Sequence, residues 1–186
     1  KSGEAKYLDA FEQTLYNGLL SGVAVSGDRF FYRNPLEATQ MSGSNTRTPY
    51  FDVACCPANL SRLLAQLPGL VYAQQGNDVF VNLYVDSEAT VKIGAASVTV
   101  KQTTNYPWDG RVTLTVTGAP KGSRVLLRAP GWLGAGPFAS DLYRFSSATA
   151  GAPAVTRAGV KLAPVMRNGW IVLDSAMIGD SRSLQL

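Results

Sequence analysis

Residues 112–117 have the sequence VTLTVT, in which apolar and hydroxyl side chains alternate. This period of two is typical of a β-strand that buries one of its faces. The alternation recurs in residues 79–85 and 98–100, and residues 125–127 and 170–173 are short apolar runs. Turn residues (Gly, Pro and Asn-Asp) separate these segments, which favours an antiparallel β-sandwich or barrel.

A helical period precedes this β-rich part. In residues 4–21, Tyr7, Phe11, Leu15 and Leu19 recur at four-residue spacing, so we expect one amphipathic helix there. Its apolar stripe has no obvious local partner and would face water unless a larger helical assembly covered it. We therefore expect the chain to be a piece of a longer protein.

Several shorter elements are expected between this helix and residue 70. Residues 23–32 are expected to form a β-hairpin, and the polar, Ser/Thr-rich residues 38–49 a loop. A short strand over residues 51–54 should lead into a second helix over residues 58–67, which Pro68 ends. The N-terminal part is therefore expected to consist of two helices and a hairpin.

The change of period marks a domain boundary. After Leu70 the apolar residues switch from helical to alternating spacing. The sequence therefore predicts a mixed α+β fold that is mainly β. We expect a helical region over residues 1–69 and an antiparallel β-sandwich domain over residues 70–186, which the chain need not contain in full.

The composition excludes several classes of protein. Hydrophobic residues make up 46% of the 186 residues and charged residues 16%, so the chain is not intrinsically disordered. No apolar run approaches the roughly 20 residues that cross a bilayer, and no membrane partner is expected. The net charge is +4, but the 17 Lys and Arg residues are scattered, so we expect a solvated surface that binds no nucleic acid.

The chain contains no histidine. It therefore cannot provide by itself a Ser-His-Asp or Cys-His catalytic system, or a Cys2His2 zinc site. Its N-terminal sequence contains no signal or targeting segment, which leaves the compartment open between cytoplasm, periplasm and secretion.

The two cysteines are adjacent and precede a proline, in the sequence Cys55-Cys56-Pro57. Pro57 suits the first position of the following helix, which makes Cys56 its N-cap. The partial positive charge of a helix N-terminus lowers the pKa of a nearby thiol, so both sulfurs could be nucleophiles or metal ligands. Two buried, inert thiols and a strained vicinal disulfide are the alternatives.

A complete zinc site is not visible in the sequence. Zinc normally takes four ligands, and two thiolates leave two positions to be filled by carboxylates. Asp52 is the nearest candidate, but in a strand over residues 51–55 it would point away from Cys55. Either the chain binds no metal, or the remaining ligands lie on polypeptide outside it.

Several motifs resemble, in order, one family of enzymes. They are residues 6–9 (KYLD), 12–18 (EQTLYNG), 29–32 (RFFY), 34–37 (NPLE), 54–57 (ACCP), 81–84 (VNLY), 106–110 (YPWDG) and 140–144 (SDLYR). This series, which covers nearly the whole chain, resembles glycoside hydrolase family 127, the β-L-arabinofuranosidases. The resemblance implies that residues 1–69 are the last elements of an (α/α)6 barrel and that residues 70–186 belong to the β-sandwich region.

The resemblance also implies a mechanism. Cys55 matches the family's nucleophile, which forms a thioglycosyl intermediate and binds zinc, and Cys56 matches a second zinc ligand. Tyr32 matches a tyrosine that lines the sugar subsite, although a packed aromatic side chain in a hairpin is an equal alternative. The implied partner is an arabinofuranose-containing glycan or oligosaccharide.

Other parts of the family's site are absent from this sequence. The acid/base glutamate and a Glu-x-Cys pair that completes the zinc site would precede residue 1. The isolated chain is therefore expected to lack hydrolytic activity and a complete zinc site, and either a preceding polypeptide or an oligomer would cover its apolar helix face.

Two other functions remain open from the residues alone. One is a non-catalytic carbohydrate-binding or interaction module, for which Trp108 would be a sugar platform; a Pro-Trp-Asp-Gly turn that closes a hairpin is the simpler interpretation of Trp108. The other is a redox-sensing or metal-responsive thiol protein that uses Cys55 and Cys56. Replacing Cys55 by Ala separates these functions, because only a hydrolase would lose turnover.

Overall fold

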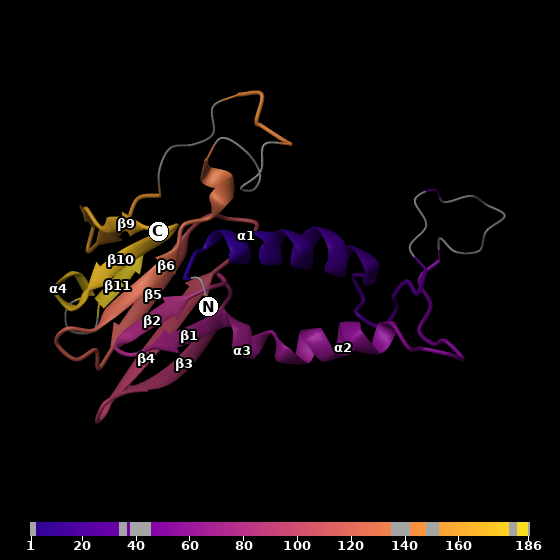
Figure 1. Cartoon of the computed structure of the whole chain (residues 1–186), viewed down its shortest axis with the longest axis horizontal. Helices are drawn as coiled ribbons and strands as arrows, with labels where there is room; N and C mark the ends of the chain where they lie inside the picture. Colours follow the sequence, from indigo (N-terminus) through magenta and orange to yellow (C-terminus); the bar gives the residue numbers. More distant parts are fainter. Residues whose placement is uncertain are drawn as a thin grey trace. The chain divides into compact units, whose positions relative to one another are not determined.

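The computed structural model describes residues 3–33, 37, 46–134, 142–147, 153–178 and 182–185. The chain divides into two compact units (Figure 1), one formed by Lys1–Asp9 with Gly69–Leu186 and the other by Ala10–Pro68. None of the helices in the described ranges is both long enough and apolar enough to cross a membrane.

The N-terminal helical segment changes its winding along its length. It consists of α1 (Lys6–Gln13), the π-helix η1 (Thr14–Leu19) and the 3-10 turn η2 (Leu20–Gly22). The predicted helix over residues 4–21 is confirmed in extent, but it is α-helical only in its first part. Side-chain hydrogen bonds from Thr14 to the Ala10 carbonyl and from Asn17 to the Gln13 carbonyl occur where the winding changes, and such bonds compete with regular helix bonding.

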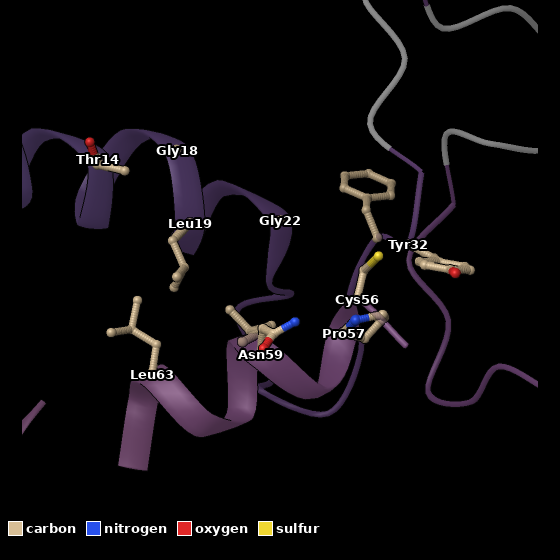
Figure 2. A pocket seen from close by; sticks show the side chains of 11 residues that line it. Thr14, Gly18, Leu19, Gly22, Tyr32, Cys56, Pro57, Asn59 and Leu63 are labelled. Carbon is tan, nitrogen blue, oxygen red and sulfur yellow. The ribbon is translucent and has the colours of Figure 1, made fainter. Parts of the chain in front are cut away.

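The second helix, α2 (Pro57–Gln66), is close to its predicted range and has Pro57 at its first turn. Its predicted end before Pro68 is confirmed, but the one-turn helix α3 (Pro68–Val71), which was not predicted, follows directly. Proline lacks only a donor that the first turn of a helix leaves unused, so Pro68 begins α3 as readily as it ends α2. Figure 2 shows the start of α2 beside the end of the N-terminal helical segment.

The hairpin predicted over residues 23–32 is reduced to an isolated bridge between Val23 and Phe30. Phe30 also forms a bridge to Thr48, which joins a third segment to this pair. The predicted strand over residues 51–54 is wrong, because these residues pair with no strand. Of the predicted loop over residues 38–49, residues 38–45 lie outside the described residues.

Two sheets form the larger part of the unit that consists of Lys1–Asp9 and Gly69–Leu186. One contains β1 (Tyr72–Gln75), β2 (Asp78–Val81), β6 (Arg124–Arg128), β10 (Trp170–Asp174) and β9 (Val165–Arg167), in that order. The other has the order β3 (Ser87–Ile93), β4 (Ala96–Thr104), β5 (Val112–Thr117), β11 (Arg182–Gln185), β7 (Thr156–Arg157), β8 (Val160–Lys161). All neighbouring strands are antiparallel except β2 and β6, which are parallel.

Both sheets contribute side chains to one hydrophobic core. In β5 the apolar residues Val112, Leu114 and Val116 are at most 1% exposed, while the threonines between them are half-buried, as the alternation predicts. The same core contains Val79 of β2 and Leu173 of β10. The predicted mixed, mainly β class with antiparallel sheets is therefore confirmed, whereas the β-sandwich and the end of a helical barrel remain predictions.

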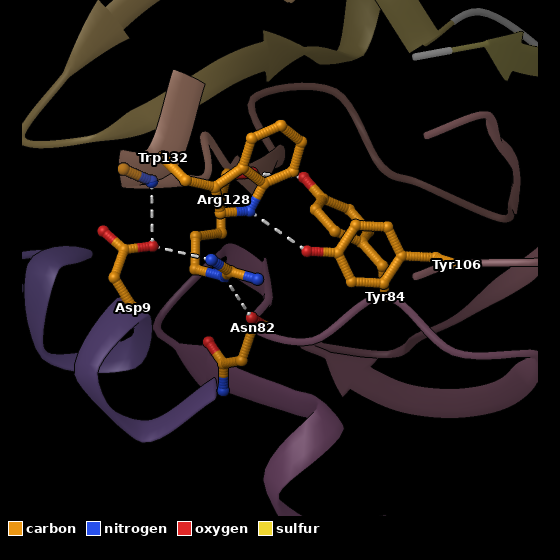
Figure 3. A network of polar contacts seen from close by, with 7 residues as sticks. Asp9, Asn82, Tyr84, Tyr106, Arg128 and Trp132 are labelled. Carbon is orange, nitrogen blue, oxygen red and sulfur yellow. Dashed lines mark hydrogen bonds and ion pairs between the residues drawn. The ribbon is translucent and has the colours of Figure 1, made fainter. Parts of the chain in front are cut away.

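A buried ion pair joins Asp9, in the first turn of α1, to Arg128 of β6 within this unit (Figure 3). The Arg128 guanidinium is fully buried and lies 2.6 Å from an Asp9 carboxylate oxygen, which also accepts the backbone N–H of Gly131 at 3.1 Å. The Arg128 Nε donates to the Asn82 carbonyl at 2.7 Å, and the Tyr84 hydroxyl donates to the Arg128 carbonyl. Because each buried charge has hydrogen-bond partners, the network offsets much of its desolvation cost.

The remaining short elements are η3 (Gly131–Leu133) and α4 (Ser175–Ile178). Trp108 lies in the turn between β4 and β5, where its backbone N–H donates to the Asn105 carbonyl at 3.0 Å. The turn predicted at this Pro-Trp-Asp-Gly sequence is thus confirmed, and the Trp108 side chain is exposed.

Candidate functional site

The cysteine pair lies at the N-terminus of α2, where the sequence places it. Cys56 is the N-cap residue and Pro57, which is buried, occupies the first turn. Both cysteines are free, and both are exposed. In the described structure, the two thiols are therefore neither buried nor joined in a disulfide, and the sulfurs are accessible.

Tyr32 reaches this pair from another segment of the same unit. Its hydroxyl oxygen lies 3.0 Å from the Cys55 Sγ, which in turn lies 3.6 Å from the Cys56 Sγ. The ring of Phe51 packs edge-on against the Tyr32 ring, with the centroids 5.3 Å apart. The structure thus brings together the three residues for which the sequence suggested a site role, Tyr32, Cys55 and Cys56, and adds Phe51 as a packing neighbour.

The three groups shift one another's pKa values. The hydrogen bond from Tyr32, followed by the one from Cys56, lowers the pKa of the Cys55 thiol. The hydrogen bond to Cys55 and the negative charge of its thiolate raise the pKa of Cys56 and raise the pKa of Tyr32 to about 12. Cys55 is therefore the first of the pair to lose its proton, and Tyr32 stays protonated as a hydrogen-bond donor at neutral pH.

The variant Tyr32→Phe should shift the deprotonation of Cys55 to higher pH, because it removes the main cause of the lowered pKa. The rate of Cys55 alkylation by iodoacetamide, located by peptide mass spectrometry in metal-free chain, measures this as a function of pH. Tyr50→Phe is the control, because the exposed Tyr50 side chain should leave the midpoint unchanged. An equal midpoint for Tyr32→Phe and wild type would contradict the prediction.

A pocket of about 440 Å³, a volume in the range of small-ligand sites, is lined by Cys56 and Tyr32 but not by Cys55. Figure 2 shows Leu19 and Leu63 pointing toward one another across it, with Asn59 and Cys56 nearer the start of α2. Residues of the N-terminal helical segment, residues 31–32 and the first turns of α2 form its walls, which are mainly apolar.

Asp52, the nearest carboxylate in the sequence, is exposed. In the described parts of the chain, no group of three or more His, Cys, Asp or Glu residues is arranged to hold a metal ion. Sequence reasoning missed Phe51 because it assigned residues 51–54 to a strand; the aromatic residues at 30, 32 and 51 are the signal that could have suggested a cluster.

Comparisons with known proteins match both parts of the chain. Residues 1–69 match the family model described as the GH127 catalytic domain of β-L-arabinofuranosidase, and residues 78–174 match the model of the GH127 middle domain. A non-reducing end β-L-arabinofuranosidase of Bifidobacterium longum subsp. longum is 33% identical over 143 residues, which are 69% of this chain and 21% of the relative.

Solved structures give the same result. A GH127 β-arabinofuranosidase is 34% identical with a TM-score of 0.83, and a GH127 β-L-arabinofuranosidase from Geobacillus stearothermophilus T6 is 33% identical with a TM-score of 0.77. Each match covers 99% of this chain but 28% of the solved chain. The chain thus spans less than a third of the length of these proteins, and it belongs to GH127, the β-L-arabinofuranosidase family of glycoside hydrolases.

Proposed function

We propose that the complete protein carrying this chain is a retaining glycoside hydrolase that releases terminal β-L-arabinofuranosyl residues from arabinofuranose-containing glycans. The observation that carries the proposal is the exposed Cys55 sulfur at the start of α2, 3.0 Å from the Tyr32 hydroxyl. A thiol nucleophile must be accessible and readily deprotonated, and the lowered pKa favours Cys55 over Cys56. The name of the Bifidobacterium relative supports the choice of sugar.

The reaction proposed for Cys55 is a double displacement. Its sulfur attacks the anomeric carbon, so that a carbon–sulfur bond forms and the bond to the leaving oxygen breaks. The leaving oxygen takes a proton from a carboxylic acid that the family resemblance places before residue 1. Water, deprotonated by the same carboxylate, then displaces the sulfur and restores the thiolate. Two inversions leave the sugar with its original anomeric configuration.

Tyr32 is proposed to contact both the nucleophile and the sugar. Its hydroxyl stabilises the Cys55 thiolate by donating a hydrogen bond, and its raised pKa of about 12 keeps the phenol protonated while it does so. A donor within 3.0 Å of the attacking sulfur is also close to any sugar ring bound there. Tyr32 therefore helps to place the anomeric carbon as well as the sulfur.

Cys55 and Cys56 are proposed to hold a zinc ion in the complete protein. Two sulfurs that each lie about 2.3 Å from one tetrahedral zinc are roughly 3.8 Å apart. The separation of 3.6 Å between the two Sγ atoms fits this arrangement. A zinc ion held there would supply positive charge and would keep the thiols deprotonated at neutral pH. The remaining ligands are proposed to come from the Glu-x-Cys pair that the resemblance places before residue 1.

The 186-residue chain alone is proposed to be inactive. The acid that protonates the leaving oxygen, a contribution of about 10²–10⁴ in rate, is proposed to lie outside these residues. The ligands that would complete the zinc site are proposed to lie outside them as well. Residues 1–69 are proposed to be the last elements of the helical catalytic barrel, and residues 70–186 the β-sandwich domain that follows it.

Zinc analysis of the complete protein tests the metal site. Native mass spectrometry should find one zinc per chain. Cys56→Ser should weaken zinc binding by more than roughly 100-fold, because the loss of a zinc ligand should cost at least as much affinity as the loss of a residue that hydrogen-bonds to a ligand. Asp52→Asn is the matched control and should retain the metal, since Asp52 is exposed and is not proposed as a ligand. Zinc bound equally well by Cys56→Ser and wild type would overturn the site.

A further inference from the structure

Arg47 joins two backbone segments close to Tyr32. Its Nη2 donates to the Ser21 carbonyl oxygen at 2.6 Å, and its Nε donates to the Gly22 carbonyl oxygen at 3.3 Å. Its guanidinium also lies over the Phe31 ring, with Cζ 4.4 Å from the ring centroid. The Arg47 side chain thus contacts both the end of the N-terminal helical segment and the residue that precedes Tyr32.

Backbone hydrogen bonds connect the same segments. The Gly22 carbonyl accepts the N–H of Phe31 at 3.0 Å as well as the Arg47 side chain. Phe30 and Thr48 exchange backbone hydrogen bonds of 3.2 Å and 3.1 Å, which places Arg47 beside the segment that carries Tyr32. The contacts of Arg47 therefore add to the backbone hydrogen bonds that hold residues 30–32 in place.

The charge of Arg47 suits its position. Ser21 and Gly22 end a helical segment, where the carbonyl oxygens lack helical partners and carry partial negative charge. A planar guanidinium can donate to two such oxygens and stack on an aromatic ring at once. A lysine ammonium at the same place keeps the charge but loses the stacking geometry and the fixed pair of donors.

We propose that Arg47 is a positioning residue, which holds residues 30–32 so that the Tyr32 hydroxyl lies against the Cys55 sulfur. This inference rests on the proposed function, because it assigns Arg47 to the support of that site. Arg47 acts through Tyr32 and does not itself contact the reacting atoms. Its removal should therefore have the consequences of losing the Tyr32 contact.

A double-mutant cycle in the complete protein tests the coupling. Arg47→Met should lower kcat on an aryl β-L-arabinofuranoside by roughly 10-fold to 100-fold, because a misplacement of about 1 Å has effects of that order. In the Tyr32→Phe background, Arg47→Met should have almost no further effect. Arg29→Met is the matched control, an exposed arginine of the same unit whose replacement should leave kcat unchanged. Arg47→Lys should fall between wild type and Arg47→Met.

A second readout does not depend on hydrolysis. After metal removal, the rate of Cys55 alkylation by iodoacetamide at one fixed pH is compared for wild type, Arg47→Met, Tyr32→Phe and the double variant. Arg47→Met should change this rate in the same direction as Tyr32→Phe, with no further change in the double variant. Arg47→Lys, which retains the charge, repeats the cycle if Arg47→Met fails to fold by circular dichroism.

The outcomes distinguish the two proposals. Equal losses from Arg47→Met in both backgrounds, in kcat and in alkylation, would mean a general structural role and would overturn the positioning role. A complete protein that hydrolyses no arabinofuranoside would refute the proposed function, and the alkylation cycle would still decide whether Arg47 positions Tyr32.

Discussion

The variant Cys55→Ala of the complete protein is expected to lose hydrolysis of β-L-arabinofuranosides by a factor on the order of 10⁴ to 10⁶, as enzymes do when a covalent nucleophile is removed. Neither neighbour is expected to replace the Cys55 thiolate, because the pKa of Cys56 is raised and the pKa of Tyr32 is raised to about 12. The loss should appear in kcat, while binding of arabinose as a product should survive.

Ser61→Ala is the matched control for this substitution. Ser61 is an exposed residue of the same helix, α2, and its truncation should leave kcat within experimental error of wild type. Undiminished hydrolysis by Cys55→Ala would exclude a cysteine nucleophile. A protein that binds glycan equally well with and without Cys55, and never hydrolyses it, would instead be a carbohydrate-binding module. A reversible, Cys55-dependent mass change on oxidation without hydrolysis would indicate a thiol sensor.

The variant Asp9→Ala is expected to destabilise the chain by about 3–5 kcal/mol, the usual cost of breaking a buried ion pair from one side. The fully buried Arg128 guanidinium would lose its contact with the Asp9 carboxylate, and the Gly131 N–H would lose its acceptor. Urea unfolding followed by tryptophan fluorescence measures this loss. The tryptophans at positions 108, 132 and 170 all lie in the unit that contains the pair.

Asp78→Ala is the matched control for this prediction. Asp78 pairs with Arg124, and the side chains are 18% and 46% exposed, so the loss of this pair should cost only about 1 kcal/mol, clearly less than the loss of the buried pair. The double variant Asp9→Leu, Arg128→Met should recover much of the stability, because it removes both buried charges at once. Equal destabilisation by Asp9→Ala and Asp78→Ala would contradict the structural importance assigned to the buried pair.

The strands that the sequence predicts carry either alternating apolar residues, as in β5, or short apolar runs, as in β6 and β10. In β5, the alternation of Val and Thr follows from the pleat, and so does the burial pattern. The short edge strand β8 was missed, because its exposed residues Val160 and Lys161 show no apolar period. The parallel pairing of β2 with β6 could not be predicted, because it depends on contacts between segments far apart in the chain.

The site was predictable only in its local part. Pro57 marks the start of α2 and therefore places the cysteines at a helix N-terminus. The contact between Tyr32 and Cys55 joins residues 23 positions apart, and no local pattern encodes it. The strand expected over residues 51–54 does not form. These residues have no partner strand, and the Phe51 ring packs against the Phe30 and Tyr32 rings in an aromatic cluster. In the sequence, Arg47 has no feature that distinguishes it from other arginines in polar loops, and only its contacts in the structure do so.

The most direct test of the account is to look for a sugar bound covalently to Cys55. The complete protein is mixed with an activated aryl β-L-arabinofuranoside, quenched in acid within milliseconds and digested for peptide mass spectrometry. The account predicts that the peptide containing Cys55 gains the mass of one pentosyl residue, that fragmentation places this mass on Cys55, and that the adduct disappears when substrate is exhausted. Efficient turnover without an adduct on Cys55, or with an adduct on another residue, would contradict the account.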